Sequence, residues 1–209
     1  MVKKLIKVVC FDIGGVLAHV CRTWAQALHH AGYPITPQSQ IGLEEWPKLR
    51  SYQTGEQSEA EYLRDLATFF DVPLEAAIAV HDGILLGPTE GTLEMIQKLN
   101  DIPIVTACFS NTNDLHWKVL LDPAKYPNIN ILKFKYASHV IHSEKPHREA
   151  YAAIERKLGV SGNEILFFED SPRNVEVALQ CNWDAHLIDH SDNQAMQVKS
   201  VLVNRKILT

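Results

Sequence analysis

Four short runs of apolar, mostly β-forming residues stand out along the chain, each bounded by charged or turn-forming residues. They are residues 5–11, 102–109, 164–168 and 184–188. A strand that helices cover on both faces has this continuous apolar character, whereas a half-exposed strand alternates apolar with polar residues. The runs therefore predict the central strands of a buried parallel sheet.

Amphipathic helical patterns separate the later runs. One pattern begins near Pro88, a second begins at Pro146, and Ser171 followed by Pro172 has the form of an N-cap with proline at the first helical position. Residues 131–142 mix strand and loop character. This alternation of strands and helices predicts an α/β fold with a doubly wound parallel sheet.

The stretch from residue 19 to residue 87 has no strand signal and room for about four helices. Ser58 and Glu61 form a capping box at the start of one of them. The 209 residues are enough for one domain with an insertion. We therefore expect an α/β core built from 1–18 and 88–209, interrupted by a helical cap at 19–87.

Charge and cysteine content exclude several classes of function. The chain has 20 Lys and Arg against 25 Asp and Glu and no basic block, so we expect no nucleic-acid or membrane partner. The four cysteines form no CxxC pair, which argues against structural zinc and disulfides. Asp12 interrupts the first apolar run too early for a signal peptide. These features predict a cytoplasmic protein with reduced thiols.

Polar and charged residues follow three of the predicted strands and precede one predicted helix. They are Asp12, Ser110, Asn111, Lys145, Glu169 and Asp170. In an open α/β sheet, ligands bind at the carboxyl ends of the strands, where such residues meet. The sequence therefore predicts one site that combines three carboxylates, a lysine, a hydroxyl and an amide.

Each of these residues also has a purely structural interpretation. Asp12 alone is compatible with a loop carboxylate, and Glu169 with Asp170 is compatible with an acidic pair that favours a helix start. Ser110 alone could cap a turn, and Lys145 alone could be a solvated surface charge. The functional interpretation rests on their occurrence together.

In this order and spacing, the motifs FDIGG, FSNTN, EKP and FFEDSPRN resemble those of the haloacid dehalogenase superfamily of aspartate-nucleophile hydrolases. The resemblance covers nearly the whole chain and places the insertion where that family has its helical cap. The longer stretches FSNTNDLHW, KYP and FFEDSPRNVEVA are most similar to small bacterial sugar-phosphate phosphatases of the α-glucose-1-phosphate type.

The resemblance implies a phosphatase in which Asp12 is the nucleophile. Three carboxylates and a phosphate ester together carry a charge of about −5, which one lysine cannot balance, so a divalent cation is needed and oxygen ligands favour Mg²⁺. By resemblance, the metal binds Asp12, the backbone carbonyl of Gly14 and Asp170, with Glu169 nearby.

The resemblance also assigns the phosphate-binding groups. Ser110 and the backbone amide of Asn111 would hold phosphoryl oxygens, and Lys145 would offset the charge shared by the nucleophile and the transferring group. The expected partner is a small phosphorylated metabolite, bound by a monomer or a homodimer. Residues of the cap that are candidates for facing the substrate are Arg22, Trp24, Trp46, Arg50 and Tyr52.

Position 14 departs from the family pattern. Most phosphatases of the family carry an aspartate there as general acid and base, whereas this chain has Gly14. Asp114, His116 or Glu144 could replace it, although nothing in the sequence places them. Without that acid, we expect substrates with acidic leaving groups, such as sugar-1-phosphates or aryl phosphates, to be preferred.

Two alternatives to the phosphatase remain at this point. One is a dehalogenase or a phosphonate hydrolase; the latter needs a cap lysine, and Lys48 is the only lysine of residues 19–87. The other is a catalytically weak or silent phosphate-binding regulatory protein. We expect the cap to hinge near residues 18–20 and 83–87, where small residues flank it.

Overall fold

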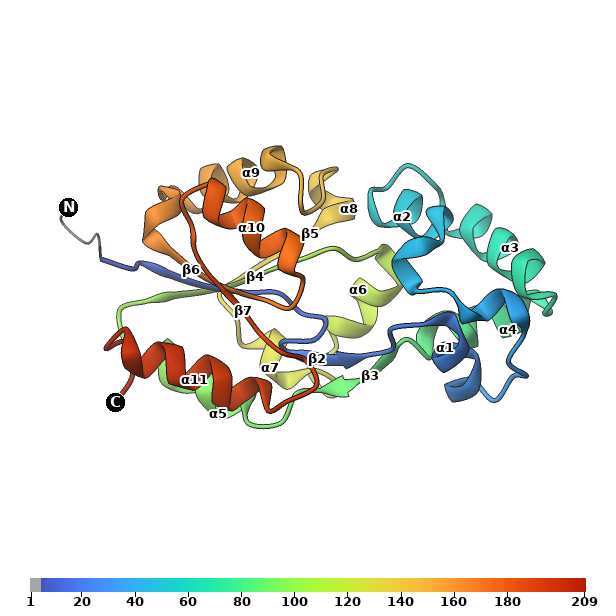
Figure 1. Cartoon of the computed structure of the whole chain (residues 1–209), viewed down its shortest axis with the longest axis horizontal. Coiled ribbons are helices and arrows are strands. Elements are labelled where there is room, and N and C mark those ends of the chain that lie inside the picture. The colour runs from blue at the N-terminus through green and yellow to red at the C-terminus, as the bar shows by residue number, and fades with distance from the viewer. Residues whose placement is uncertain (1–4) are drawn as a thin grey trace.

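The computed structural model describes residues 5–209 and places a five-stranded parallel sheet at the centre of the larger part of the molecule (Figure 1). In sheet order the strands are β5 (Phe134–Ala137), β4 (Val105–Ser110), β1 (Val8–Phe11), β6 (Ile165–Glu169) and β7 (Asp184–Leu187). All four runs predicted as strands contribute one, and the ambiguous segment 131–142 supplies β5. The predicted doubly wound α/β fold is confirmed.

Alternate residues of β1 enter two different hydrophobic cores. Val8 and Cys10 pack on the face covered by α9 (Arg148–Leu158) and α10 (Pro172–Gln180). Val9 and Phe11 pack on the opposite face. That face is covered by α5 (Thr92–Asn100), α6 (Asp114–Leu120), α7 (Pro127–Asn130) and α11 (Gln194–Asn204). Because both faces are buried, the strand has no polar side, as its sequence predicts.

Two of the predicted helix boundaries need comment. Pro172 occupies the first turn of α10, with Ser171 as the N-cap residue, as predicted. The helix predicted near Pro88 begins later, at Thr92, because Pro88 belongs to a strand. The remaining short helices of the core are α8 (Ser138–Ile141) and the 3₁₀ turn η3 (Gly162–Glu164).

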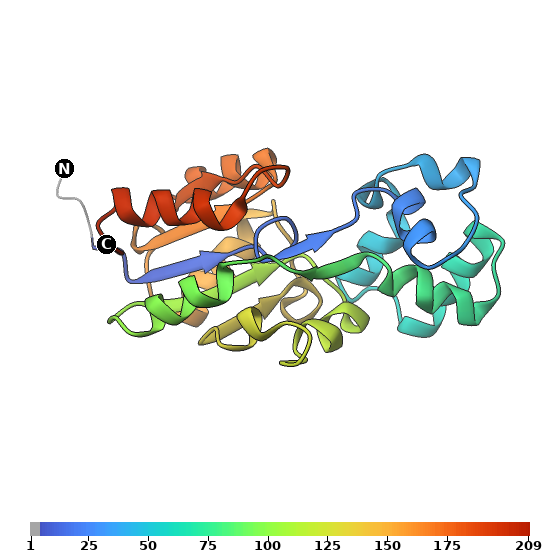
Figure 2. The ribbon, with the colours of Figure 1, turned by 90° about the horizontal axis from the view of Figure 1, so that it is seen from below.

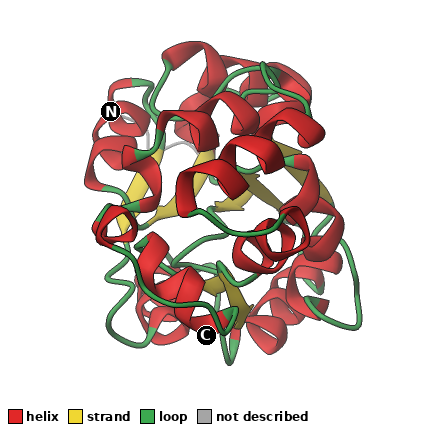
Figure 3. Ribbon diagram, turned by 90° about the vertical axis from the view of Figure 1, so that its right-hand side faces the viewer, coloured by secondary structure: helices red, strands yellow, loops and turns green. Residues whose placement is uncertain are grey.

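The insertion forms a helical body with its own core. Its helices are α1 (Trp24–His30), α2 (Pro47–Gln53), α3 (Glu59–Phe70) and α4 (Leu74–Asp82), with 3₁₀ turns η1 (Pro37–Gln40) and η2 (Leu43–Glu45). The Ser58 side chain accepts a hydrogen bond from the Glu61 amide, so the predicted capping box opens α3. Aromatic side chains of these helices pack together in a separate cluster. Figure 3 views the molecule from this side, with the insertion nearest the reader.

A two-stranded antiparallel ribbon joins the two bodies, which corrects the prediction that residues 19–87 hold no strand. It pairs β2 (Ala18–Val20), which runs from the core towards the insertion, with β3 (Leu85–Pro88), which runs back towards the core (Figure 2). Each strand is only three or four residues long, and β3 contains a glycine and a proline that are typical of turns. Across residues 5–209, no helix has the length and apolar character that crossing a bilayer requires.

Candidate active site

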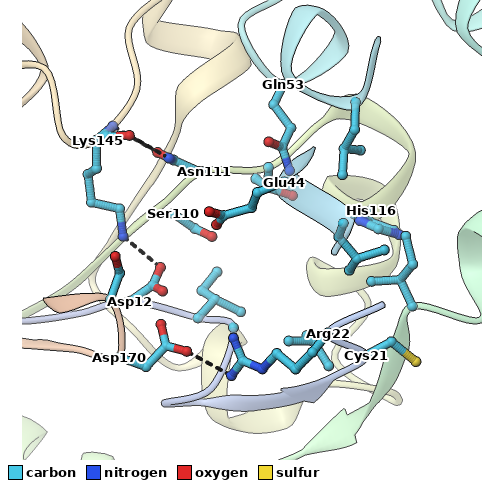
Figure 4. Close-up of a pocket in the computed structure, with 18 of the residues that line it drawn as sticks. Asp12, Cys21, Arg22, Glu44, Gln53, Ser110, Asn111, His116, Lys145 and Asp170 are labelled. Atoms are coloured by element: carbon cyan, nitrogen blue, oxygen red, sulfur yellow. Dashed lines mark hydrogen bonds and ion pairs between the residues drawn. The ribbon is translucent and has the colours of Figure 1, made fainter. Parts of the chain in front are cut away.

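The six polar residues predicted from the strand ends lie around one cavity of about 460 Å³. The cavity lies between the carboxyl edge of the sheet and the insertion, whose residues form its other wall (Figure 4). The residues that meet there are Asp12, Ser110, Asn111, Lys145, Glu169 and Asp170. The expectation that these side chains converge is therefore met by the geometry.

The turn after β1 fixes Asp12 at the floor of this cavity. The Asp12 amide donates to the carbonyl oxygen of Phe168 at 2.8 Å, and the Ile13 carbonyl accepts three amides of the following turn. Gly15 has a φ of +78°, and a Cβ there would lie 2.3 Å from an Asp170 carboxylate oxygen. Glycine is thus required both for the backbone conformation and for the close approach of Asp170.

Lys145 connects two carboxylates. Its Nζ lies 2.8 Å from Asp12 Oδ1 and 2.6 Å from Glu169 Oε2, and its side chain is only 1% exposed. The ammonium also lies over the rings of Phe109 and Phe167, at 5.2 and 5.4 Å from their centroids. Burial alone would lower the pKa of Lys145, but the two carboxylates outweigh it and raise this pKa above its ordinary value. The lysine is therefore a permanent cation beside Asp12.

Backbone and amide contacts hold this ion-pair network in place. The Asn111 side chain donates to the Lys145 carbonyl at 2.8 Å and accepts from the Lys145 amide at 2.9 Å. Glu169 Oε1 accepts from the amides of Asp170 and Ser171, both at 3.0 Å. Both oxygens of Glu169 are therefore engaged, which makes this residue an anchor for Lys145.

The carboxylates form a donor set that suits a hard cation. Oxygen atoms of Asp12, Glu169 and Asp170 lie within 4.8 Å of one another. Burial, reinforced by Glu169, raises the pKa of Asp12 to about 6, although Lys145 opposes the shift. Burial and Asp12 likewise raise the pKa of Asp170, and Arg22 opposes this from 2.7 Å. Such crowded oxygen ligands fit Mg²⁺, whose charge would relieve their repulsion.

Four of the five cap residues predicted to face the substrate do not line the cavity, namely Trp24, Trp46, Arg50 and Tyr52. Arg22 lines the cavity as expected, but Trp46 and Tyr52 do not, because they are buried in the core of the insertion. Trp46 packs edge-on against Trp24 at 5.3 Å between ring centroids, and Tyr52 stacks on Tyr62 at 4.4 Å. These aromatic residues stabilise the insertion instead of contacting a ligand.

Arg50, the remaining arginine among the cap candidates, does not line the cavity. Its Nε donates to a carboxylate oxygen of Glu144, so it forms an ion pair between the insertion and the core.

The cavity is also lined by residues that no sequence pattern singles out. The turn at 42–45 contributes Glu44, and α2 contributes Gln53, both of which point into the cavity in Figure 4. No periodicity or motif marks this turn. Contacts with distant parts of the chain bring it to the site, and a local sequence pattern does not show such contacts. His190, after β7, lies at the same cavity.

Several solved structures share this fold. A haloacid dehalogenase (HAD) family enzyme of Bacteroides thetaiotaomicron matches with a TM-score of 0.76 and 22% identity, covering 93% of this chain and 99% of that one. A predicted HAD-like hydrolase of Porphyromonas gingivalis matches with a TM-score of 0.76 and 20% identity, covering 95% and 98%. The L-2-haloacid dehalogenase of Xanthobacter autotrophicus, with chloropropionic acid covalently bound, has a TM-score of 0.65 at 20% identity, covering 98% and 85%.

The sequence itself matches a protein family over most of its length. A search of curated proteins found no similar sequence. The model of the haloacid dehalogenase-like hydrolases, however, matches residues 6–182, which include all six residues of the predicted site. This chain therefore belongs to the haloacid dehalogenase-like hydrolase family.

Proposed function

We propose that the protein is a Mg²⁺-dependent phosphatase that acts on a small phosphorylated metabolite through a phosphoryl group carried on Asp12. The observation that carries this proposal is the fixed contact between Lys145 and Asp12 at 2.8 Å, on the floor of a cavity that Ser110 and Asn111 also line. Lys145 can offset the charge of an incoming phosphoryl group while it remains in contact with Asp12.

The chain's own residues account for the chemistry. An oxygen of Asp12 attacks phosphorus, the ester P–O bond breaks, and the leaving oxygen takes up a proton. Water then attacks the phosphoryl group on Asp12 and releases inorganic phosphate with the free carboxylate. Ser110 and the Asn111 amide would hold the phosphoryl oxygens through both steps, while Lys145 keeps Asp12 ionised and oriented.

A divalent cation completes the charge balance. Among the described residues that line the cavity, five carboxylates face two cationic side chains, before any phosphate is bound. Asp12, Asp170 and the Gly14 carbonyl would hold Mg²⁺, which would offset the negative charge of the substrate. A crystal structure of the similar Bacteroides enzyme, with a TM-score of 0.74 at 21% identity, contains magnesium and inorganic phosphate, which supports this proposal.

The cavity indicates a small substrate. Its volume of about 460 Å³ falls at the lower end of the range for small-molecule sites. The insertion supplies one wall and acts as the cap that selects the substrate. We infer that sugar-1-phosphates are a preferred class, because their more acidic leaving oxygen depends less on a proton donor than that of an alkyl ester, and Gly14 is not a donor.

The competing hypotheses lack comparable support. A phosphonate hydrolase needs a lysine from the cap, and the one candidate in residues 19–87 is Lys48. This lysine pairs with Asp65 at 3.1 Å and does not line the cavity. A dehalogenase needs no acidic pair like Glu169 and Asp170 to hold a metal.

The direct test is phosphate release from aryl and sugar phosphates, with Mg²⁺ or with chelator. We expect Mg²⁺-dependent release that D12N abolishes and D114N retains, since Asp114 lies outside the cavity. Phosphate binding without release would instead support the silent regulatory protein. Halide release from a 2-haloacid without Mg²⁺ would support the dehalogenase.

A further inference from the structure

Because position 14 is a glycine, no side chain at that position can transfer the protons that ester hydrolysis requires. The leaving oxygen of an alkyl ester needs a proton, and the second step needs a base to take a proton from water. Gly14 can do neither, although it lines the cavity. Some other group that reaches the cavity must exchange this proton if alkyl esters are to be hydrolysed.

The candidates named from sequence are all engaged elsewhere. Asp114 pairs with Lys118 at 2.6 Å on the surface of α6, and Glu144 binds Arg50. Neither lines the cavity. These two carboxylates are therefore excluded as proton donors by their positions.

His116 does line the cavity, but its ring is part of a buried network. Its Nε2 lies 2.9 Å from the His81 carbonyl oxygen, and its Nδ1 lies 3.5 Å from the Asn113 side chain. The ring stacks on that of His81 at 3.8 Å. Burial lowers the pKa of His116 to about 4, so the ring is neutral near pH 7. It is a structural contact between the core and the insertion.

Most carboxylates at the cavity also have fixed partners. Glu169 binds Lys145, and Asp170 binds Arg22. Glu45 accepts the Gly42 amide at 3.1 Å and closes its own turn.

Glu44 differs from these carboxylates. Within residues 5–209, its side chain forms no hydrogen bond or ion pair, and Figure 4 shows its carboxylate directed into the cavity on the side of Ser110 and Asp12.

The turn that carries Glu44 is held firmly in place. Gly42 forms an antiparallel bridge with Thr23, and the Leu43 amide donates to the Arg22 carbonyl at 3.1 Å. Directly after the turn, Trp46 is buried in the insertion core. These contacts tie both ends of the turn, so the direction of Glu44 follows from the fold of the insertion.

We propose that Glu44 is the proton-transfer residue of this enzyme and replaces the side chain absent at Gly14. The inference rests on the proposed phosphatase activity. Protonated Glu44 gives its proton to the leaving oxygen as the ester P–O bond breaks. The resulting carboxylate takes a proton from the water that attacks the phosphoryl group on Asp12, which restores the acid. The cap thereby supplies part of the chemistry, in addition to the substrate wall.

The test compares E44Q with wild type on a series of phosphate esters whose leaving alcohols range from p-nitrophenol to alkyl alcohols. General acid catalysis is worth about 10²–10⁴-fold, so E44Q should lose that factor with alkyl esters. The first-turnover burst of p-nitrophenol should be nearly unchanged, because this leaving group needs no proton. The burst therefore also reports that E44Q is folded and binds substrate. E45Q is the matched control, since glutamine can still accept the Gly42 amide.

The outcomes separate the two proposals. Equal alkyl-ester rates for E44Q and wild type, or a loss found in H190Q instead, would overturn the role of Glu44 while leaving the phosphatase intact. Absence of phosphate release from every ester in the wild-type protein would overturn both. Recovery of alkyl-ester hydrolysis in G14D/E44Q would support the proposal further, because an acid at either position then suffices.

Discussion

Replacing the nucleophile should stabilise the metal-free protein. The ionised Asp12 carboxylate is buried beside Glu169, and its pKa is about 6 instead of the ordinary 3.8. At about 1.4 kcal/mol per pKa unit, ionised Asp12 costs the fold about 3 kcal/mol above pH 7. Asparagine has the same shape and no charge, so D12N should raise the free energy of unfolding by about 1–3 kcal/mol.

The pH dependence of this difference has a definite sign. A carboxyl group whose pKa is raised in the folded state binds its proton more tightly there than in the unfolded chain. Wild type should therefore lose stability relative to D12N as the pH rises from about 4 through 6, and the two proteins should converge at the acidic end.

Urea unfolding in chelator at several pH values measures both effects. D114N is the control, because Asp114 is half-exposed and pairs with Lys118 on the surface. Saturating Mg²⁺, at about 100 times its dissociation constant, should return about 2.7 kcal/mol to wild type and less to D12N. A D12N protein that is less stable than wild type at pH 8 in chelator would refute the reasoning.

Three further predictions address other contacts. R22M should bind Mg²⁺ more tightly than wild type by calorimetry, because Arg22 competes with the cation for Asp170; unchanged affinity would contradict this competition. G14D should fold normally, since the nearest atom to a new Cβ lies at 3.4 Å, and it should change alkyl-ester rates little in a leaving-group series, because Glu44 already supplies the proton; a large gain would contradict the role of Glu44. Y62F should lower the free energy of unfolding by about 1–3 kcal/mol in urea, because it leaves the buried His81 Nδ1 without its hydrogen-bond partner; no change would mean that water replaces the hydroxyl.

The sheet and the polar side of its active site could be predicted because both follow from local patterns. The run around β4 ends in Ser110, and the run around β6 ends in Glu169 and Asp170, so the strand positions also locate the polar residues. The parallel arrangement then brings these ends to one edge. No contact between distant residues had to be known in advance.

The insertion could not be predicted to the same depth because its geometry depends on contacts between distant residues. Trp46 and Glu44 are two positions apart, yet one fills the aromatic core and the other faces the cavity. Without a regular helical or strand period in this turn, the sequence does not indicate which side chain points inward. The ribbon of β2 and β3 could not be predicted for the same reason, since its two short strands pair with each other across more than sixty residues of sequence.

The central claim is that a phosphoryl group passes through Asp12. Rapid acid quenching of the enzyme with Mg²⁺ and an aryl phosphate, followed by peptide mass spectrometry, tests it directly. We predict a peptide that contains Asp12 and has gained the mass of one phosphoryl group, formed at the rate of the phenol burst and absent in D12N. A burst of phenol with no modified peptide, or phosphate released at the wild-type rate by D12N, would contradict the account.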